Sequence, residues 1–174
     1  MEAALRDTID RFLHHLTLVR NVSPHTRRAY ASDLDSFARW VPRDTTVPGI
    51  DRLLLRGYLA ALFRRGLSRG TIARHRATLG SFCRWLHREG HLQVDPADGL
   101  FAPRRGRHLP RHLPVNEVIA VLEAPDEKTP LGRRDRVVLE TLYATGCRVS
   151  ELTGLDLDDV SPDDGVVRLH GKGR

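Results

Sequence analysis

The part of the sequence best suited to chemistry is Ala144–Leu152, which reads ATGCRVSEL. A helix that ends at Gly146 and starts again with Arg148 directs an arginine out of a tight turn near a helix N-terminus. Backbone N–H groups and the helix dipole favour an anion there, and a guanidinium adds a planar fork of donors. Glu151, three residues further on, can lie beside this guanidinium and hold it. We therefore predict a site for one phosphate group at Arg148, and the alternative is an ordinary surface ion pair between Arg148 and Glu151.

A second candidate is His170–Arg174, which reads HGKGR. Glycines on both sides of Lys172 permit a tight turn, so that the backbone and the ammonium group can approach a ligand closely. The pattern is not a P-loop, because the glycines are wrongly spaced and neither Ser nor Thr follows Lys172. Lys172 is thus a candidate ligand-binding cation, and an ordinary solvated hairpin turn is the alternative.

Four helical patterns occupy the first 90 residues and predict a compact bundle with short loops. Ser23 is expected to cap the second helix, with Pro24 at its first position, and Ser68 to cap the fourth. The predicted buried faces are formed by Leu5, Ile9, Phe12, Leu13 and Leu16, by Tyr30, Leu34, Phe37 and Val41, by Leu55, Tyr58, Leu59 and Leu62, and by Ile72, Leu79, Phe82 and Leu86.

The stretch from Asp95 to Pro114 mixes prolines with arginines without any period, and it is interpreted as an extended basic linker. The predicted organisation is a helical domain over residues 1–100, a linker over 101–113 and the beginning of another domain over 114–174. In this last part we expect a short helix around Val118–Leu122, a longer one running to Gly146, a helical turn from Arg148, and a strand over Val166–His170.

The charge is unevenly distributed between the two predicted domains. Residues 1–107 carry 19 basic and 10 acidic side chains, whereas residues 108–174 carry 9 basic and 12 acidic ones. Nearly all of the basic residues are arginines, whose planar forks suit phosphate groups, so the front domain is expected to bind a polyanion, and nucleic acid is favoured over a membrane surface.

Several other classes of protein are disfavoured. No apolar stretch approaches the roughly 18 residues of a membrane span, and the expected location is the cytoplasm. The only cysteines, Cys83 and Cys147, fall in different helical patterns and are expected to be ordinary reduced thiols. The histidines are scattered without the spacing of a metal site.

Taken together, the motifs resemble those of the tyrosine recombinases of the Xer or phage integrase type. The resemblance spans essentially the whole chain and includes NVSPHTRRAYASDL, TIARHRATLGSFCRWLHREG, DPADGL, ATGCRVSEL and VVRLHGKGR. It implies a mainly α fold, in which a four-helix SAM-like core-binding domain precedes the start of an α+β catalytic domain. It also implies that Arg148 is the first catalytic arginine and that Lys172 is the hairpin lysine, which acts as general acid to the leaving 5′-oxygen.

The expected partners are double-stranded DNA and other recombinase protomers, because intact members of the family act as tetramers on DNA. In that reaction a tyrosine attacks the scissile phosphate, and a 3′-phosphotyrosyl link conserves the bond energy without ATP. The resemblance therefore implies that neither a metal nor another cofactor is needed, which agrees with the scattered histidines. Chromosome partition at cell division and transposon or phage integration both stay open as the biological role. Expected DNA contacts are Thr26, Arg27 and Arg28 on the second helix, Arg69, Thr71, Arg74 and Arg76 on the fourth, and Arg104 and Arg105 in the linker.

One departure from the family pattern is large. The family's H-x-x-R pair, its later His or Trp and its nucleophilic tyrosine belong after the hairpin, beyond Arg174. Tyr30, Tyr58 and Tyr143 are expected to be core residues, so the chain is expected neither to cleave nor to join DNA, and Val137, Val138 and Leu142 are expected to lose part of their cover. The alternatives are a helical regulator that occupies recombination sites without chemistry and a phosphate-handling enzyme of another kind.

Overall fold

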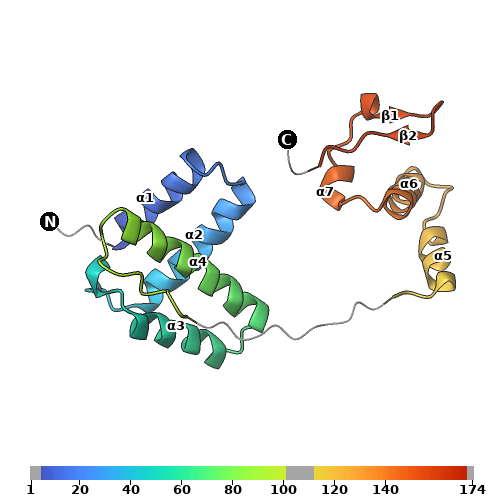
Figure 1. The fold of residues 1–174 in the computed structure, drawn as a ribbon. Helices are drawn as coiled ribbons and strands as arrows, with labels where there is room; N and C mark the ends of the chain where they lie inside the picture. The colour runs from blue at the N-terminus through green and yellow to red at the C-terminus, as the bar shows by residue number, and fades with distance from the viewer. Residues whose placement is uncertain (1–4, 101–111, 172–174) are drawn as a thin grey trace. The chain divides into compact units, whose positions relative to one another are not determined.

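The computed structural model describes residues 5–100 and 112–171. The chain divides into two compact units, Met1–Arg107 and His108–Arg174, and each is described by itself (Figure 1). The predicted mainly helical architecture is confirmed in both units. No helix in the described ranges is long and apolar enough to cross a membrane.

Residues 5–100 of the first unit form four α-helices, and all four were predicted. They are α1 (Leu5–Leu18), α2 (Pro24–Trp40), α3 (Arg52–Arg64) and α4 (Arg69–Arg88), with a short 3₁₀ turn, η1 (Val47–Gly49), between α2 and α3. Ser23 and Ser68 cap α2 and α4 as predicted, and the Asp51 carboxylate caps α3 by accepting the Leu54 N–H at 2.7 Å. These side-chain caps satisfy backbone donors that would otherwise be unpaired at the starts of α2, α3 and α4.

Aromatic rings at the middle of the bundle hold α1, α2 and α4 together. The Phe12 ring lies 5.3 Å from that of Phe82, 5.5 Å from that of Trp85 and 6.1 Å from that of Tyr30. Such tilted pairs add about 0.5–1.5 kcal/mol each beyond the burial of their area. The predicted apolar faces of all four helices contribute to this one core.

The segment after α4 departs from the predicted linker. Its residues up to Leu100 fold back onto the bundle, where Ala97 and Leu100 are buried. The Arg76 Nε donates to the Leu100 carbonyl at 2.8 Å, which holds this end in place. The extended conformation expected for residues 95–100 is therefore wrong, although the predicted helical domain over residues 1–100 already included them. Burial of Ala97 and Leu100 and a hydrogen bond from the charged Arg76 side chain attach this segment to the first unit.

The second unit begins with two helices, α5 (Val115–Glu123) and α6 (Pro130–Thr145), and continues with the short helix α7 (Val149–Leu152). After the turn η2 (Leu157–Asp159), the strands β1 (Val160–Ser161) and β2 (Val166–Val167) form an antiparallel hairpin. Val160 is opposite Val167 and Ser161 is opposite Val166. The strand expected over Val166–His170 is thus shorter than predicted, and β1, which pairs with it, was not predicted.

Burial differs sharply between the units. In the described part of the second unit, Gly132 is the only buried residue. Val137 is 65 % exposed, and Val138 and Leu142 are only partly covered, as expected from the sequence. Tyr143 is also 65 % exposed, so the prediction that it is a core residue is wrong: the described part of this unit leaves most of this side chain uncovered. Tyr58 is buried and Tyr30 packs against the core, as predicted.

Candidate phosphate site and nucleic-acid interface

The turn between α6 and α7 determines where Arg148 lies. Gly146 ends α6 in the left-handed conformation, with φ of 63°, and its N–H donates to the Leu142 carbonyl at 2.9 Å. A left-handed residue reverses the chain direction at little cost only when it lacks a Cβ. Arg148 then occupies the N-cap position of α7 in an extended conformation, two residues after the glycine.

Glu151 holds Arg148 through two contacts. Its Oε1 lies 2.6 Å from the Arg148 guanidinium, and its Oε2 accepts the Arg148 backbone N–H at 2.8 Å. The Glu151 side chain is 11 % exposed, whereas that of Arg148 is 74 % exposed. The carboxylate thus fixes one edge of the guanidinium, and the remaining N–H groups face solvent.

These two contacts also determine the charge of Glu151. The Arg148 backbone N–H, followed by the Arg148 guanidinium, lowers the pKa of the Glu151 carboxyl below its ordinary value. Glu151 is therefore ionised at neutral pH and keeps Arg148 in one orientation. A guanidinium that is oriented before a ligand arrives loses less conformational entropy when it binds a phosphate.

The hairpin brings the glycine before Lys172 next to this pair. A Cβ built on Gly171 would lie 3.8 Å from the Glu151 Oε1. Lys172 itself lies outside the described residues. That Arg148 and Lys172 share one site therefore stays a prediction.

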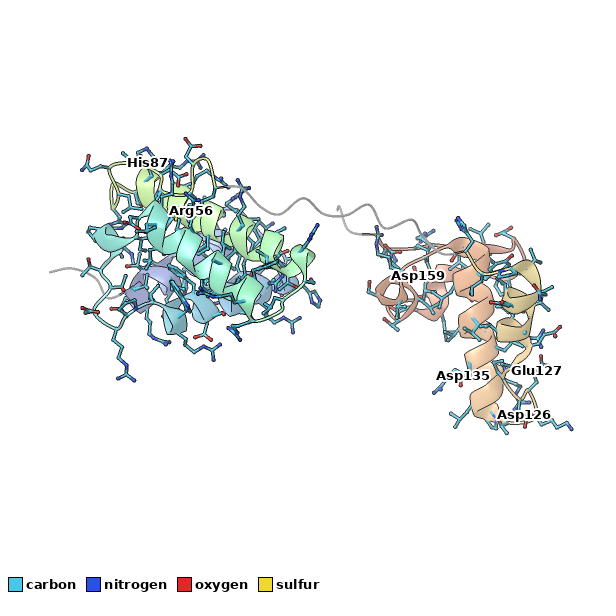
Figure 2. The ribbon with its side chains drawn as sticks, turned by 90° about the horizontal axis from the view of Figure 1, so that it is seen from below. Arg56, His87, Asp126, Glu127, Asp135 and Asp159 are labelled. Atoms are coloured by element: carbon cyan, nitrogen blue, oxygen red, sulfur yellow. The ribbon has the colours of Figure 1, made fainter. Side chains whose placement is uncertain are left out.

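Asp159 and His170 anchor the same hairpin, and sequence reasoning did not find them. The His170 Nε2 lies 2.8 Å from the Asp159 Oδ1, and the Arg168 N–H donates to the Asp159 carbonyl at 2.8 Å. The Asp156 backbone N–H, followed by His170, lowers the pKa of the Asp159 carboxyl. Figure 2 places Asp159 at the end of the second unit opposite Asp126 and Glu127. No local pattern links residues 11 positions apart in a loop, so the sequence carried no signal for this contact.

In the first unit, the predicted DNA contacts within the described residues lie on α2 and α4, which contact each other. The Thr26 and Thr71 hydroxyls each lie 2.9 Å from the capping serine of their own helix, Ser23 or Ser68. Arg27 and Arg69 are exposed, and neither has an ion-pair partner within residues 5–100. Arg28 hydrogen-bonds to the Nδ1 of His25 at 2.9 Å. The first turns of α2 and α4, here called their N-terminal arms, therefore each present one arginine without an ion-pair partner in the described residues, Arg27 and Arg69.

Arg74 and Arg76 are held within the unit rather than free. Arg74 forms an ion pair with Asp33 of α2, and its side chain is 46 % exposed. Arg76 is partly buried through its contact with Leu100. The sequence held a signal for Asp33, because it lies three residues after Tyr30 and four before Phe37, on the buried face of α2. The predicted contacts Arg104 and Arg105 lie outside the described residues.

Other candidate chemistry is limited in the part of the chain that the structure describes. No group of three or more potential metal ligands occurs there. Both cysteines are free, and burial raises the pKa of the Cys83 thiol to about 12, so it is no nucleophile at neutral pH.

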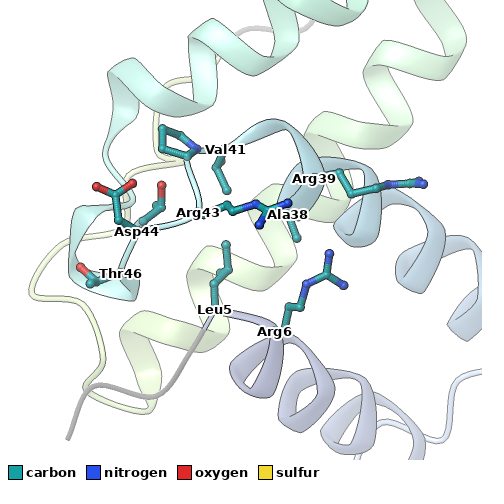
Figure 3. Close-up of a pocket in the computed structure, with 10 residues that line it drawn as sticks. Leu5, Arg6, Ala38, Arg39, Val41, Arg43, Asp44 and Thr46 are labelled. Carbon is teal, nitrogen blue, oxygen red and sulfur yellow. The ribbon is translucent and has the colours of Figure 1, made fainter.

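A pocket of about 590 Å³ opens beside the start of α1 and the end of α2 (Figure 3). None of the predicted site residues lines it, and two of its arginines, Arg6 and Arg39, pair with Asp35.

Comparisons with known proteins match both units. Residues 9–90 match the phage integrase N-terminal SAM-like domain, and residues 111–174 match the phage integrase family. The tyrosine recombinase XerC of Pelobacter propionicus is 42 % identical over 173 residues, which are 97 % of this chain and 57 % of that protein. XerD of Pseudomonas aeruginosa is 41 % identical over 166 residues, 95 % of this chain and 56 % of the relative. The chain thus spans little more than half the length of these relatives.

Solved structures show the same fold. A lambda integrase in a tetramer bound to a Holliday junction superposes with a TM-score of 0.76 at 22 % identity, over 92 % of this chain and 44 % of that one. The N-terminal domain of a phage integrase/site-specific recombinase from Haloarcula marismortui superposes with a TM-score of 0.52 at 23 % identity, over 59 % of this chain and 99 % of that one. The predicted fold, a SAM-like helical domain followed by the start of a catalytic domain, is confirmed.

Proposed function

Because this chain belongs to the phage integrase family of tyrosine recombinases, we propose that it binds duplex DNA at a recombination site and directs Arg148 to a backbone phosphate. The arrangement of Arg148 carries the proposal. Its guanidinium is exposed and forms an ion pair with Glu151, which is ionised and nearly buried. Arginine forks bind the non-bridging oxygens of a phosphate through two parallel hydrogen bonds.

In the proposed mechanism, Arg148 stabilises the negative charge that develops on the non-bridging oxygens when the phosphate is attacked. Glu151 does not touch the phosphate; it keeps the guanidinium in the orientation that the transition state needs. In the family's reaction a tyrosine oxygen forms a bond to the phosphorus while the bond to the 5′-oxygen breaks. Lys172, which follows the glycine beside Glu151, would donate a proton to that leaving oxygen. The proposed setting is the cytoplasm, with other protomers as partners on the DNA; strand exchange would follow only where a tyrosine nucleophile attacks the phosphate.

The first unit supplies the proposed affinity for DNA. Its arginine excess lies on a bundle with a complete core, and Arg27 and Arg69 are unpaired on the N-terminal arms of α2 and α4. Helix N-termini and arginines are common contacts to the phosphates that flank a major groove. We propose that these arms bind one duplex and that their phosphate contacts make the affinity fall with salt.

The test is the salt dependence of duplex binding by the full 174-residue chain. We expect the logarithm of the association constant for a labelled 30-base-pair duplex to fall linearly with the logarithm of KCl concentration. The slope should be about −0.9 per phosphate neutralised, and Arg27→Ala and Arg69→Ala should each lower its magnitude by about one. Fluorescence anisotropy titrations between 50 and 300 mM KCl give the association constants from which this slope is obtained.

Arg134→Ala is the matched control, because Arg134 is exposed but pairs with Asp135 on α6. It should leave the slope unchanged, and a flat salt response of the parent chain would refute DNA binding through phosphates. A nicked duplex in the same assay distinguishes strand cleavage from mere occupancy of the site. We propose occupancy alone for these 174 residues, and an adduct that survives denaturing electrophoresis and disappears in Tyr143→Phe would contradict this.

A further inference from the structure

The buried carboxylate of Asp33 binds three donors of α4. It accepts hydrogen bonds from the Thr78 hydroxyl at 2.8 Å and from the Arg74 guanidinium, and the His75 Nε2 lies 3.2 Å away. The Asp33 side chain is 2 % exposed, while that of Arg74 is 46 % exposed. A buried carboxylate with this many donors has one stable position, so it also fixes the part of Arg74 that it touches.

A third helix braces the same group. The Tyr58 hydroxyl of α3 lies 3.1 Å from the His75 Nδ1, and the two rings meet edge to face at 5.8 Å. When the His75 Nε2 carries the proton and donates a hydrogen bond to Asp33, the Nδ1 accepts a hydrogen bond from the Tyr58 hydroxyl. Both ring nitrogens of His75 and the Tyr58 hydroxyl then have a partner. The network therefore fixes the crossing of α2 and α4 as well as the Arg74 side chain.

Arg74 differs in this respect from the other exposed arginines of the arms. Arg27 and Arg69 have no acidic partner in the described residues, whereas the Asp33 carboxylate compensates the charge of Arg74. A compensated guanidinium adds little to the long-range attraction of phosphates. It still has N–H groups directed to solvent, on the α4 face shared with Thr71. A fixed fork of donors is what recognition of a guanine O6 and N7 in the major groove requires.

We infer that Asp33 is a positioning residue that holds Arg74 as a reader of a guanine edge, while the unpaired arginines supply affinity without sequence preference. This inference rests on the proposed binding of duplex DNA. Asp33 does not touch the DNA; it acts by holding one edge of the guanidinium, so that the other edge meets the base in a single orientation.

The experiment measures base preference rather than affinity alone. The full chain is used to select from a pool of 30-base-pair duplexes with a randomised centre, and the bound fraction is sequenced. We expect guanine to be enriched about tenfold at one position, as for one good bidentate contact. Arg74→Ala and Asp33→Asn should both abolish enrichment at that position. Asp33→Asn should retain or raise the affinity for unselected duplex, because it removes a negative charge, whereas loss of folding would lower it.

Three controls separate positioning from stability. Thr78→Val removes another hydrogen bond to the same carboxylate without touching Arg74, so it should keep the guanine preference. Arg69→Ala should weaken binding to all sequences equally. Arg74→Lys keeps the charge and the contact to Asp33 but lacks the fork, so it should lose the preference and keep the affinity, even if Asp33→Asn does not fold.

The outcomes distinguish this inference from the proposed function. In the double variant Asp33→Asn with Arg74→Ala, the preference should be no lower than in Arg74→Ala. The inference is overturned if the parent chain binds duplex without any base preference, or if Arg74→Lys or a folded Asp33→Asn keeps the preference. The proposed function itself fails only if the parent chain shows no salt-dependent duplex binding.

Discussion

At the scale of single residues, His75 couples the stability of the first unit to pH. Burial lowers the pKa of His75, and Arg74 and Arg65 lower it further, against the opposing effect of Asp33. In the unfolded chain the histidine titrates near its ordinary pKa of about 6.5. Below that pH the unfolded chain takes up a proton that the folded chain resists, so the free energy of unfolding should fall as the pH drops below about 6.5, by at most about 1.4 kcal/mol per pH unit.

Urea unfolding followed by circular dichroism at pH 7.5, 6.5 and 5.5 measures this fall. His75→Gln, which can still donate and accept a hydrogen bond, should be less stable at pH 7.5 but should lose much of the pH dependence. His14→Gln, at an exposed position of α1, is the control and should behave like the parent chain. An unchanged pH dependence in His75→Gln would show that His75 is not the titrating group.

At the scale of elements, matching serine caps start the two helices that carry the proposed DNA contacts. The Ser23 hydroxyl accepts the Thr26 N–H at 3.2 Å, and the Ser68 hydroxyl accepts the Thr71 N–H at 3.1 Å. Ser23→Ala and Ser68→Ala should each lower the free energy of unfolding by about 1 kcal/mol, because one backbone donor loses its partner. Chemical denaturation followed by the circular dichroism of the helices measures this change in the free energy of unfolding.

Ser32→Ala provides the matched control on α2 itself. Ser32 is exposed within the helix, where alanine has the better helix propensity, so this change should raise stability by less than about 0.5 kcal/mol. If Ser68→Ala proves as stable as Ser32→Ala, the Ser68 hydroxyl does not contribute as a cap.

At the scale of the whole molecule, the two units differ in how much core they have. The first unit buries a continuous apolar cluster, whereas Gly132 is the only buried residue in the described part of the second. Local opening costs little where few apolar contacts are lost. Trypsin should therefore cleave within residues 112–171 well before it cleaves within residues 5–100, although the first unit has more arginines.

Mass spectrometry of a digestion time course identifies the order of cleavage. In 8 M urea both units are unfolded, and their sites should then be cut at similar rates. Equal survival of the two units without urea would contradict the difference in stability that we infer from burial.

The sequence by itself determined the features that depend on neighbours along the chain. The spacing of apolar residues predicted α1 to α4, and Ser23, Ser68 and Gly146 marked helix boundaries that the structure confirms. The contact between Arg148 and Glu151 was also predictable, because residues three apart at a helix start lie side by side. Local sterics and local hydrogen bonds decide all of these.

Only the tertiary structure decided which distant residues meet. The pairing of Asp33 with Arg74 spans 41 positions and depends on how α2 crosses α4, which the period of neither helix specifies. The packing of Leu100 on the bundle, the hairpin contact of His170 with Asp159 and the exposure of Tyr143 likewise depend on what lies opposite each residue in space. A helical period shows which face is buried, but the partner that covers this face is chosen by packing among elements far apart in the chain.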